Sequence, residues 1–145
     1  MIGWREWLVL PDLGIARVKA KTDTGARTSA LHADELERFV ARGRPMARFV
    51  VHPLQRNRET FVHCEAEIVD ERSVRSSSGA EELRPVVRTR VAIRERSWLI
   101  EVTLTNRDVM GFRMLLGRQA LRGHILVDPG RSYLGNPRPK RRARK

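Results

Sequence analysis

A carboxylate, a small hydroxyl residue and a glycine stand together near the start of the chain, as Asp23-Thr24-Gly25. An apolar, strand-like stretch precedes them and a second apolar stretch follows. Such a triplet could present the Asp23 carboxylate on a tight loop, where it would act as a general acid or base. The alternative is an ordinary β-turn, because Asp, Thr and Gly are all common turn residues. The triplet alone does not decide between the two interpretations.

A second motif, Leu115-Leu116-Gly117-Arg118, lies late in the chain, and residues 119–122 after it suit a short helix. Together the two motifs resemble retroviral-type aspartic peptidases. In that family two apolar residues and a glycine form a strand beside the active-site loop, and a short helix follows. The resemblance also implies a flap hairpin between the motifs, and residues 75–85 hold the turn residues for one. The order and spacing of these segments favour the peptidase interpretation over the simple turn.

Nearly the whole chain, from Trp4 to Leu134, is similar to one bacterial and archaeal family of retropepsin-like proteins. The segments that carry this resemblance are Lys21 to His32, Val51 to Gln55, Val74 to Gly79, Thr103 to Asp108 and Met110 to Arg118. The family is often labelled "ATP-dependent zinc protease", and its members are associated with ATP-grasp ligases that add glutamates to protein tails. The resemblance implies an aspartic endopeptidase that is a homodimer, and it makes an ATP-grasp ligase a candidate partner.

The zinc and ATP parts of that label find no motif in this sequence. There is no His-Glu-x-x-His, and His32, His52, His63 and His124 stand singly without the spacing of metal ligands. No Gly-x-x-x-x-Gly-Lys-[Ser/Thr] loop is present either. Because neighbours in a strand point to opposite faces, we expect Cys64 to be a buried thiol and His63 a surface residue. We therefore predict a peptidase without a metal or cofactor, and any use of ATP would fall to a partner.

The chemistry explains why a homodimer is expected. Amide hydrolysis needs one group that takes a proton from water and another that protonates the carbonyl oxygen. Two carboxylates about 3 Å apart cannot both ionise, so they share one proton. Asp23 would be the base and the partner subunit's Asp23 the acid, because a two-fold interface repeats each residue across its axis. Thr24 would buttress the loop through its hydroxyl, and Gly25 would let the backbone approach the substrate.

The residue after Asp-Thr-Gly-Ala departs from the retroviral pattern and bears on specificity. In that family it is typically acidic and pairs with the arginine after the late glycine, whereas here it is Arg27, so that Arg27 and Arg118 are both basic. Arginine binds carboxylates well, so we predict an acidic substrate such as a glutamate-rich peptide tail. The predicted substrate-binding residues are Ala26, Arg27, Arg75, Ser77, Ser78, Gly79, Arg84, Arg88 and Arg118. The alternative is that Arg27 pairs with a local acid, Glu35 or Asp108.

Composition indicates one domain with a separate tail. The 145 residues carry 29 Lys and Arg against 17 Asp and Glu, and six of the basic residues stand in the last ten. We predict a peptidase domain over residues 1–135 and a disordered basic tail over 136–145. The tail could contact RNA, ribosomes or an acidic protein, or it could only aid solubility. The single cysteine excludes an internal disulfide, and the lack of a long apolar run or leader predicts a cytoplasmic protein without a membrane span.

The body of the chain predicts an all-β fold, a small closed barrel with one short helix. The expected strands are 5–10, 15–21, 48–51, 61–69, 86–93 and 98–104, which are rich in β-branched and aromatic residues. Residues 33–42 could be a helix or one arm of a hairpin that turns at 42–45. Besides the peptidase, two functions stay open: a catalytically inactive module that binds acidic peptide for an ATP-grasp ligase, and an RNA- or ribosome-associated protein.

Overall fold

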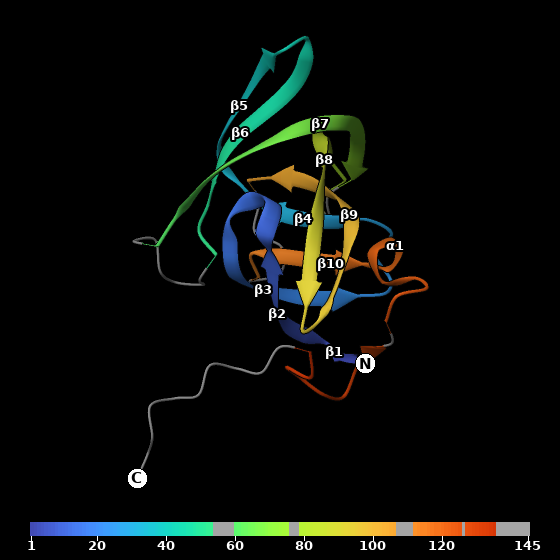
Figure 1. The fold of residues 1–145 in the computed structure, drawn as a ribbon. Helices are drawn as coiled ribbons and strands as arrows, with labels where there is room; N and C mark the ends of the chain where they lie inside the picture. Colours follow the sequence, from blue (N-terminus) through green and yellow to red (C-terminus); the bar gives the residue numbers. More distant parts are fainter. Residues whose placement is uncertain (54–59, 76–78, 107–111, 126, 136–145) are drawn as a thin grey trace.

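Six strands close into a β-barrel in the order β2-β3-β10-β4-β9-β8, and a pairing of Val9 with Ala92 joins β8 back to β2. The computed structural model describes residues 1–53, 60–75, 79–106, 112–125 and 127–135. The barrel strands are β2 (Arg5–Leu10), β3 (Ile15–Asp23), β4 (Ser29–His32), β8 (Glu81–Ile93), β9 (Arg96–Thr105) and β10 (Met114–Gly117). The predicted closed, nearly all-β barrel is therefore confirmed (Figure 1).

Alternation of side chains along the strands explains why this sequence closes around a core. On β8, Val87, Val91 and Ile93 are buried, whereas Arg88 and Arg90 between them are exposed. Successive residues of a strand point to opposite faces, so one face of β8 enters the barrel and the other meets solvent. The strand predicted over 86–93 is confirmed, although β8 begins five residues earlier than the alternation indicated.

Three further strands extend the sheet outward from β8: β7 (Val62–Arg75), β6 (Arg44–Val51) and β5 (Asp34–Ala41). Strands β5 and β6 form a hairpin that rises away from the barrel (Figure 1). Its two turn residues, Arg42 and Gly43, both have positive φ, 54° and 75°. Two-residue turns of this kind match the twist of a hairpin. Residues 33–42 are thus an arm of a hairpin, and their helical alternative is wrong because strand pairing decides the conformation of this short segment.

Strand β7 pairs with two neighbouring strands, one after the other along its length. Its first part pairs with β6 as far as Glu67, and its second part pairs with β8 from Ile68 to Arg75, with a register shift between Ile68 and Asp70. Figure 1 shows β7 arching over the barrel from the β5–β6 hairpin toward the side where α1 (Arg118–Leu121) lies. The predicted hairpin around 75–85 is present, with β7 and β8 as its arms, and residues 76–78 lie outside the described residues.

The two ends of the described chain meet on one side of the barrel. Strand β1 (Ile2–Gly3) pairs in parallel with β11 (Val127–Asp128), and a short 3-10 helix, η1 (Pro11–Leu13), joins β2 to β3. The α-helix α1 matches the helix predicted over 119–122, displaced by one residue. In the described part of the chain we find no helix that is long and apolar enough to cross a membrane.

A buried carboxylate ties these ends together. The Glu6 side chain is fully buried and accepts hydrogen bonds from the backbone N–H groups of Gly3 (2.6 Å), Leu134 (2.7 Å) and Gly135 (2.9 Å). A buried carboxylate without partners would be costly, and these three donors satisfy it. The guanidinium of Arg5, stacked between Trp4 and Tyr133, holds the same C-terminal segment against β2 from outside.

Cys64 and His63 lie as their alternation predicts. Cys64 is 2% exposed, its Sγ lies 3.4 Å from the carbonyl oxygen of Leu13, and burial raises the pKa of its thiol to about 11. His63 is exposed on the opposite face of β7. The thiol is therefore a core side chain rather than a reactive group.

Candidate active site

Asp23 is the last residue of β3 and begins the loop to β4. The N–H of Gly25 donates to Asp23 Oδ1 at 3.0 Å, and the N–H of Ala26 donates to the Asp23 carbonyl oxygen at 3.1 Å. A Cβ on Gly25 would lie 3.2 Å from Asp23 Oδ1, so glycine leaves this carboxylate uncrowded. The tight turn that the residue types predict is present, and it is built around the half-buried Asp23 carboxylate.

Strand β10 supports this loop from below. It pairs in parallel with β3, so that Gly117 lies opposite Asp23, and the Gly117 N–H donates to Ser29 Oγ at 3.0 Å. The first turn of α1 holds the other side of the loop, because the Arg118 N–H donates to the Ala26 carbonyl oxygen at 2.8 Å. The late motif and the triplet are therefore two halves of one local structure, as their resemblance to retroviral-type peptidases implied.

Sequence reasoning missed two hydroxyl residues that fix this loop. Ser29, 1% exposed, accepts the bond from Gly117, and Thr22 donates from Oγ1 to the Gly3 carbonyl oxygen at 2.9 Å. Small hydroxyl residues at buried strand positions carry no signal that separates them from other core residues. Thr24 was the predicted buttress, but its side chain is exposed, and its hydroxyl makes no hydrogen bond within the described residues. The buttressing role of Thr24 stays a prediction, and it requires that a second chain supply the hydrogen-bond partner of the Thr24 hydroxyl.

A hollow of about 610 Å³ opens between this loop and the second part of β7. The loop and the start of α1 supply one wall, and five consecutive residues of β7 supply the other. The lining residues are Arg27, Thr28, Glu71, Arg72, Ser73, Val74, Arg75 and Gln119. The structure thus brings Arg27 and Arg75 to one cavity beside the Asp23 loop.

The other predicted substrate-binding residues lie elsewhere. Arg84 and Arg88 do not line this cavity, and each has an acidic partner, Glu82 at 3.5 Å and Glu101 at 3.5 Å. Arg88 lies on the exposed outer surface of β8, whereas the Arg84 side chain is only 12% exposed and its Nε is buried. Gly79, at φ 86°, lies exposed between the two arms of the β7–β8 hairpin. The predicted contacts of Ser77 and Ser78 fall outside the described residues.

Arg27 and Arg118 are exposed, and neither guanidinium makes an ion pair within the part of the chain that the structure describes. Pairing of Arg27 with Glu35 is not observed, because Glu35 lines a different hollow with Glu82 and Leu83. The other suggested partner, Asp108, lies outside the described residues. Among the cations that line the cavity, Arg27 is the one whose charge no described carboxylate neutralises.

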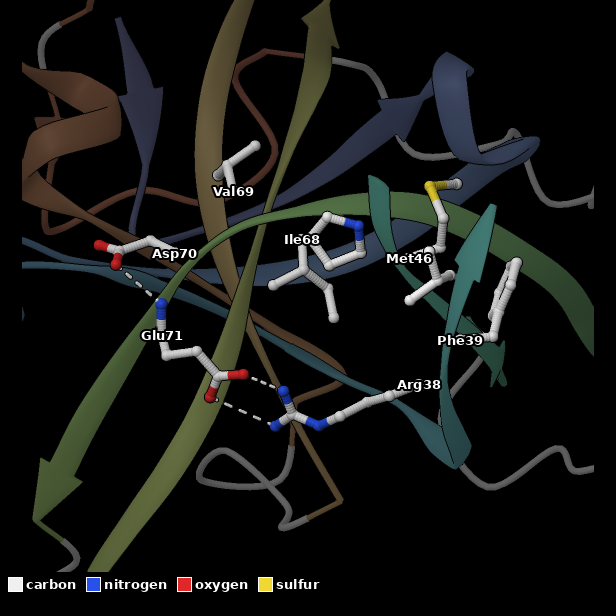
Figure 2. Close-up of a pocket in the computed structure, with 9 residues that line it drawn as sticks. Arg38, Phe39, Met46, Ile68, Val69, Asp70 and Glu71 are labelled. Atoms are coloured by element: carbon white, nitrogen blue, oxygen red, sulfur yellow. Dashed lines mark hydrogen bonds and ion pairs between the residues drawn. The ribbon is translucent and has the colours of Figure 1, made fainter. Parts of the chain in front are cut away.

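A second hollow, of about 520 Å³, follows the first along β7 and shares Glu71 with it. Figure 2 shows Arg38 reaching from β5 to pair with both carboxylate oxygens of Glu71, across one end of the hollow. Most of its walls are apolar, formed by Phe39, Val40, Pro45, Met46, Ile68 and Val69. The tip of the β5–β6 hairpin therefore overhangs an apolar groove next to the polar cavity.

The structure also brings together two histidines that are separate in the sequence. His32 Nε2 lies 4.0 Å from Asp34 Oδ1, and His52 Nε2 lies 3.5 Å from Asp34 Oδ2. His32 Nε2 is also 3.0 Å from the Asn106 carbonyl oxygen. Within the described residues, no group of three or more His, Cys, Asp or Glu side chains has the geometry of a metal site.

A closed β-barrel with an Asp-Thr-Gly loop seated on a Leu-Leu-Gly strand defines the retropepsin-like class of aspartic peptidases. Comparison of the sequence with known families agrees with this class. The chain belongs to the family described as "Retropepsin-like aspartic endopeptidase RimB", which matches residues 1–138.

Curated relatives carry a different name. The chain is 44% identical over 133 residues to a protein of Shewanella pealeana, 45% over 129 residues to one of Desulfotalea psychrophila, and 46% over 139 residues to one of Parasynechococcus marenigrum. Each of the three is named "Probable alpha-L-glutamate ligase". The matches cover 92%, 89% and 95% of this chain but 29%, 28% and 30% of the relatives. The chain therefore spans less than a third of the length of these relatives.

A solved structure shares the fold. The crystal structure of Lpg0085 from Legionella pneumophila, a protein of unknown function, superposes with a TM-score of 0.75 at 29% sequence identity. The match covers 92% of this chain and 95% of that one. The architecture described above is thus found in an experimental structure over almost its whole length.

Proposed function

We propose that the protein is an aspartic endopeptidase that hydrolyses peptide bonds with an Asp23 dyad shared by two chains. The observation that carries the proposal is the Asp23 carboxylate itself, held by the Gly25 N–H at the end of β3. Beside its loop lies a cavity of about 610 Å³, which is large enough for several side chains of a peptide. Membership of the retropepsin-like family supports the same chemistry.

The reaction needs one proton to move in each direction. Ionised Asp23 takes a proton from a water molecule, and the water oxygen bonds to the carbonyl carbon of the scissile peptide. The partner subunit's protonated Asp23 gives its proton to the carbonyl oxygen. When the carbon–nitrogen bond breaks, one carboxyl of the dyad gives its proton to the leaving amine, and the other carboxylate takes a proton from a hydroxyl of the tetrahedral intermediate, so the dyad again holds one proton. No single described chain can supply both roles from Asp23, so activity requires a homodimer.

The substrate in this proposal is an acidic peptide, such as a glutamate-rich tail. Arg27 lines the cavity without an acidic partner in the described structure, so its charge is available to a substrate carboxylate. Arg75 lines the same cavity, and its pairing with Glu81 at 3.4 Å is between two well-exposed side chains, so a substrate carboxylate can displace it at little cost.

Cleavage of two matched peptides tests this function. The wild type and an Asp23→Asn variant are incubated with a peptide that carries a run of glutamates and with its glutamine counterpart, and the products are identified by mass. We expect the wild type to cut the glutamate peptide faster and the variant to cut neither. Equal cutting of both peptides would reject the acidic specificity, and cutting by the variant would reject the Asp23 mechanism.

A second candidate is a non-cleaving module that presents acidic peptides to a glutamate ligase. The observation that favours it is that relatives covering this chain at 44–46% identity are named glutamate ligases and are more than three times as long as the matched segment. The same experiment separates the candidates. The module predicts tight binding of the glutamate peptide by both wild type and Asp23→Asn, with no cleavage by either protein at any pH.

A further inference from the structure

Arg72 is the most strongly held cation of the cavity beside the Asp23 loop, and it is absent from the residues that the sequence predicts for the site. Its Nη2 donates to Glu101 Oε1 at 2.5 Å, and its Nε lies 3.6 Å from Asp70 Oδ2. The side chain is 29% exposed, whereas that of Arg75 is 73% exposed. Because water screens Arg72 less than Arg75, its charge acts more strongly on a nearby anion.

Glu101 stands next to the cavity on strand β9. Ser29 pairs with Val102 in the parallel ladder of β4 and β9, so Glu101 is level with Thr28, one of the cavity-lining residues. Arg88 lies directly opposite Glu101 on β8, and its Nη2 is 3.5 Å from Glu101 Oε2. The Glu101 carboxylate thus bridges Arg88 and the cavity-lining Arg72.

We propose that Arg72 selects an acidic side chain of the substrate and that Glu101 weakens this selection as an internal competitor. The inference rests on the proposed peptidase function and adds two residues to its specificity. Arg72 has five N–H donors, of which the hydrogen bond to Glu101 engages one and the ion pair with Asp70 lies near another, so the rest can bind a substrate carboxylate. Glu101 lowers the affinity for such a carboxylate in two ways, by occupying part of the guanidinium and by repelling a second negative charge.

Competition from Glu101 distinguishes peptides with several acidic residues from peptides with one. A single substrate carboxylate must share Arg72 with Glu101, which is always present. Such a carboxylate therefore adds little to the binding affinity. A run of carboxylates places several charges against Arg27, Arg72 and Arg75 together, and their combined attraction exceeds the repulsion from Glu101 and from Glu71, which also lines the cavity but is paired with Arg38. Glu101 therefore sets a threshold that favours polyacidic peptides over peptides with an isolated acid.

The test compares Arg72→Gln, Glu101→Gln and a control, Glu67→Gln. Glu67 makes a similar exposed pair with Arg44 at 3.4 Å, and its side chain is 42% exposed against 36% for Glu101. The two glutamate variants change the net charge equally, so only the position of the lost carboxylate differs. We measure KM and kcat for the glutamate peptide and for its glutamine counterpart. Thermal unfolding of each variant shows whether it still folds.

The two sides of the pair should act in opposite directions. Arg72→Gln should raise KM for the glutamate peptide about three- to tenfold, and Glu101→Gln should lower it by a similar factor. Neither change should alter KM for the glutamine peptide by more than about twofold, and Glu67→Gln should behave as wild type. If the pair were only structural, both variants would change KM in the same direction or leave it unchanged, and the inference would be wrong.

Binding separates this inference from the peptidase proposal. The same substitutions are made in Asp23→Asn protein, and anisotropy of a labelled glutamate peptide gives Kd without any need for cleavage. Opposite shifts of Kd for Arg72→Gln and Glu101→Gln support the selection mechanism even if no peptide is ever cut, which would reject the peptidase proposal alone. If Kd shifts in the same direction for both variants, or does not shift, the inference is overturned. Cleavage of the peptide by the wild type would still leave the peptidase proposal standing.

Discussion

Gly117 lies opposite Asp23 in the parallel ladder of β10 and β3, and its Cα faces the backbone of Thr28. A Cβ built on Gly117 would lie 2.6 Å from both the carbonyl carbon and the oxygen of Thr28. Side chains do not approach backbone atoms so closely, so the loop that carries Asp23 can sit on β10 only because residue 117 is glycine. This contact explains why the early triplet and the late Leu-Leu-Gly motif occur together.

Gly117→Ala should therefore displace the Asp23 loop. The loop must shift to admit the methyl group, which should destabilise the protein by about 1–3 kcal/mol and lower kcat more than it raises KM. Gly130→Ala is the control, because its added Cβ would find its nearest neighbour at an ordinary 3.5 Å. Denaturant unfolding and peptide cleavage measure both variants. Wild-type stability and kcat in Gly117→Ala would show that the contact does not position the loop.

Glu6→Gln should loosen the junction between the two ends of the chain. Glutamine replaces one carboxylate oxygen with an NH2 group, which cannot accept a hydrogen bond. At least one backbone N–H that now donates to Glu6 would then face another N–H donor. We expect a loss of about 2–4 kcal/mol in the free energy of unfolding. Glu95→Gln, an exposed change in the turn between β8 and β9, should cost under about 0.5 kcal/mol. Equal unfolding curves for the two variants would contradict the role given to Glu6.

The Cys64 thiol predicts a loss of stability at alkaline pH. Burial raises its pKa from an ordinary 9.0 to about 11, so the folded protein keeps a proton that the unfolded chain releases over this range. The unfolded state is then favoured as the pH rises from 9 toward 11, whereas below pH 9 the full stability is present. The relevant quantity is the difference between wild type and Cys64→Ala, which isolates the contribution of this thiol.

Over pH 9 to 11 the wild type should lose up to about 2 kcal/mol more than Cys64→Ala. The thiol should also resist alkylation in the folded protein at pH 8 and react in denaturant. Parallel stability curves for the two proteins, together with rapid alkylation of the native protein, would mean that the thiol is not buried in solution.

Arg27→Gln should remove part of the preference for acidic substrates. Arg27 is exposed, so its interaction with a substrate carboxylate is partly screened by water. We expect KM for the glutamate peptide to rise about three- to tenfold and KM for the glutamine peptide to stay within about twofold. Arg42→Gln in the distant β5–β6 turn removes the same charge and serves as the control. An equal effect of both variants would indicate general electrostatic attraction instead of recognition in the cavity.

Much of the barrel follows from local sequence signals. Alternation along 86–93 and 98–104 predicts two adjacent strands, which β8 and β9 confirm. The predicted turn, Glu95-Arg96-Ser97, is displaced: the structure turns at Arg94-Glu95, and Arg96 and Ser97 already belong to β9. The presence of the triplet indicates that the late motif should also be present, because the contact between the two involves only a few neighbouring backbone atoms. Residues 33–42 could not be assigned, because helical spacing of Leu36, Phe39 and Val40 competed with a pairing that depends on distant strands.

The candidate site was predictable where it is local and not where it depends on register. Asp23, Gly25 and Arg27 lie on one loop, and their proximity follows from the sequence. The Arg72–Glu101 pair joins strands β7 and β9 across β8, so it depends on two ladders that the sequence does not specify. The same is true of His32 and His52 around Asp34. The homodimer, the domain boundary at 135, the cytoplasmic location and the role of the tail stay predictions.

The shared dyad is the central claim, and mixed dimers test it most directly. Wild type at a concentration where it is dimeric is allowed to exchange subunits with added Asp23→Asn protein, and total cleavage of the glutamate peptide is measured. If both carboxylates are required, only dimers of two wild-type chains are active. Cleavage should then fall to about one half with one equivalent of variant and about one quarter with three, because subunits pair at random. Cleavage that stays constant at every ratio would show that a single chain carries the whole catalytic site and would contradict the shared dyad.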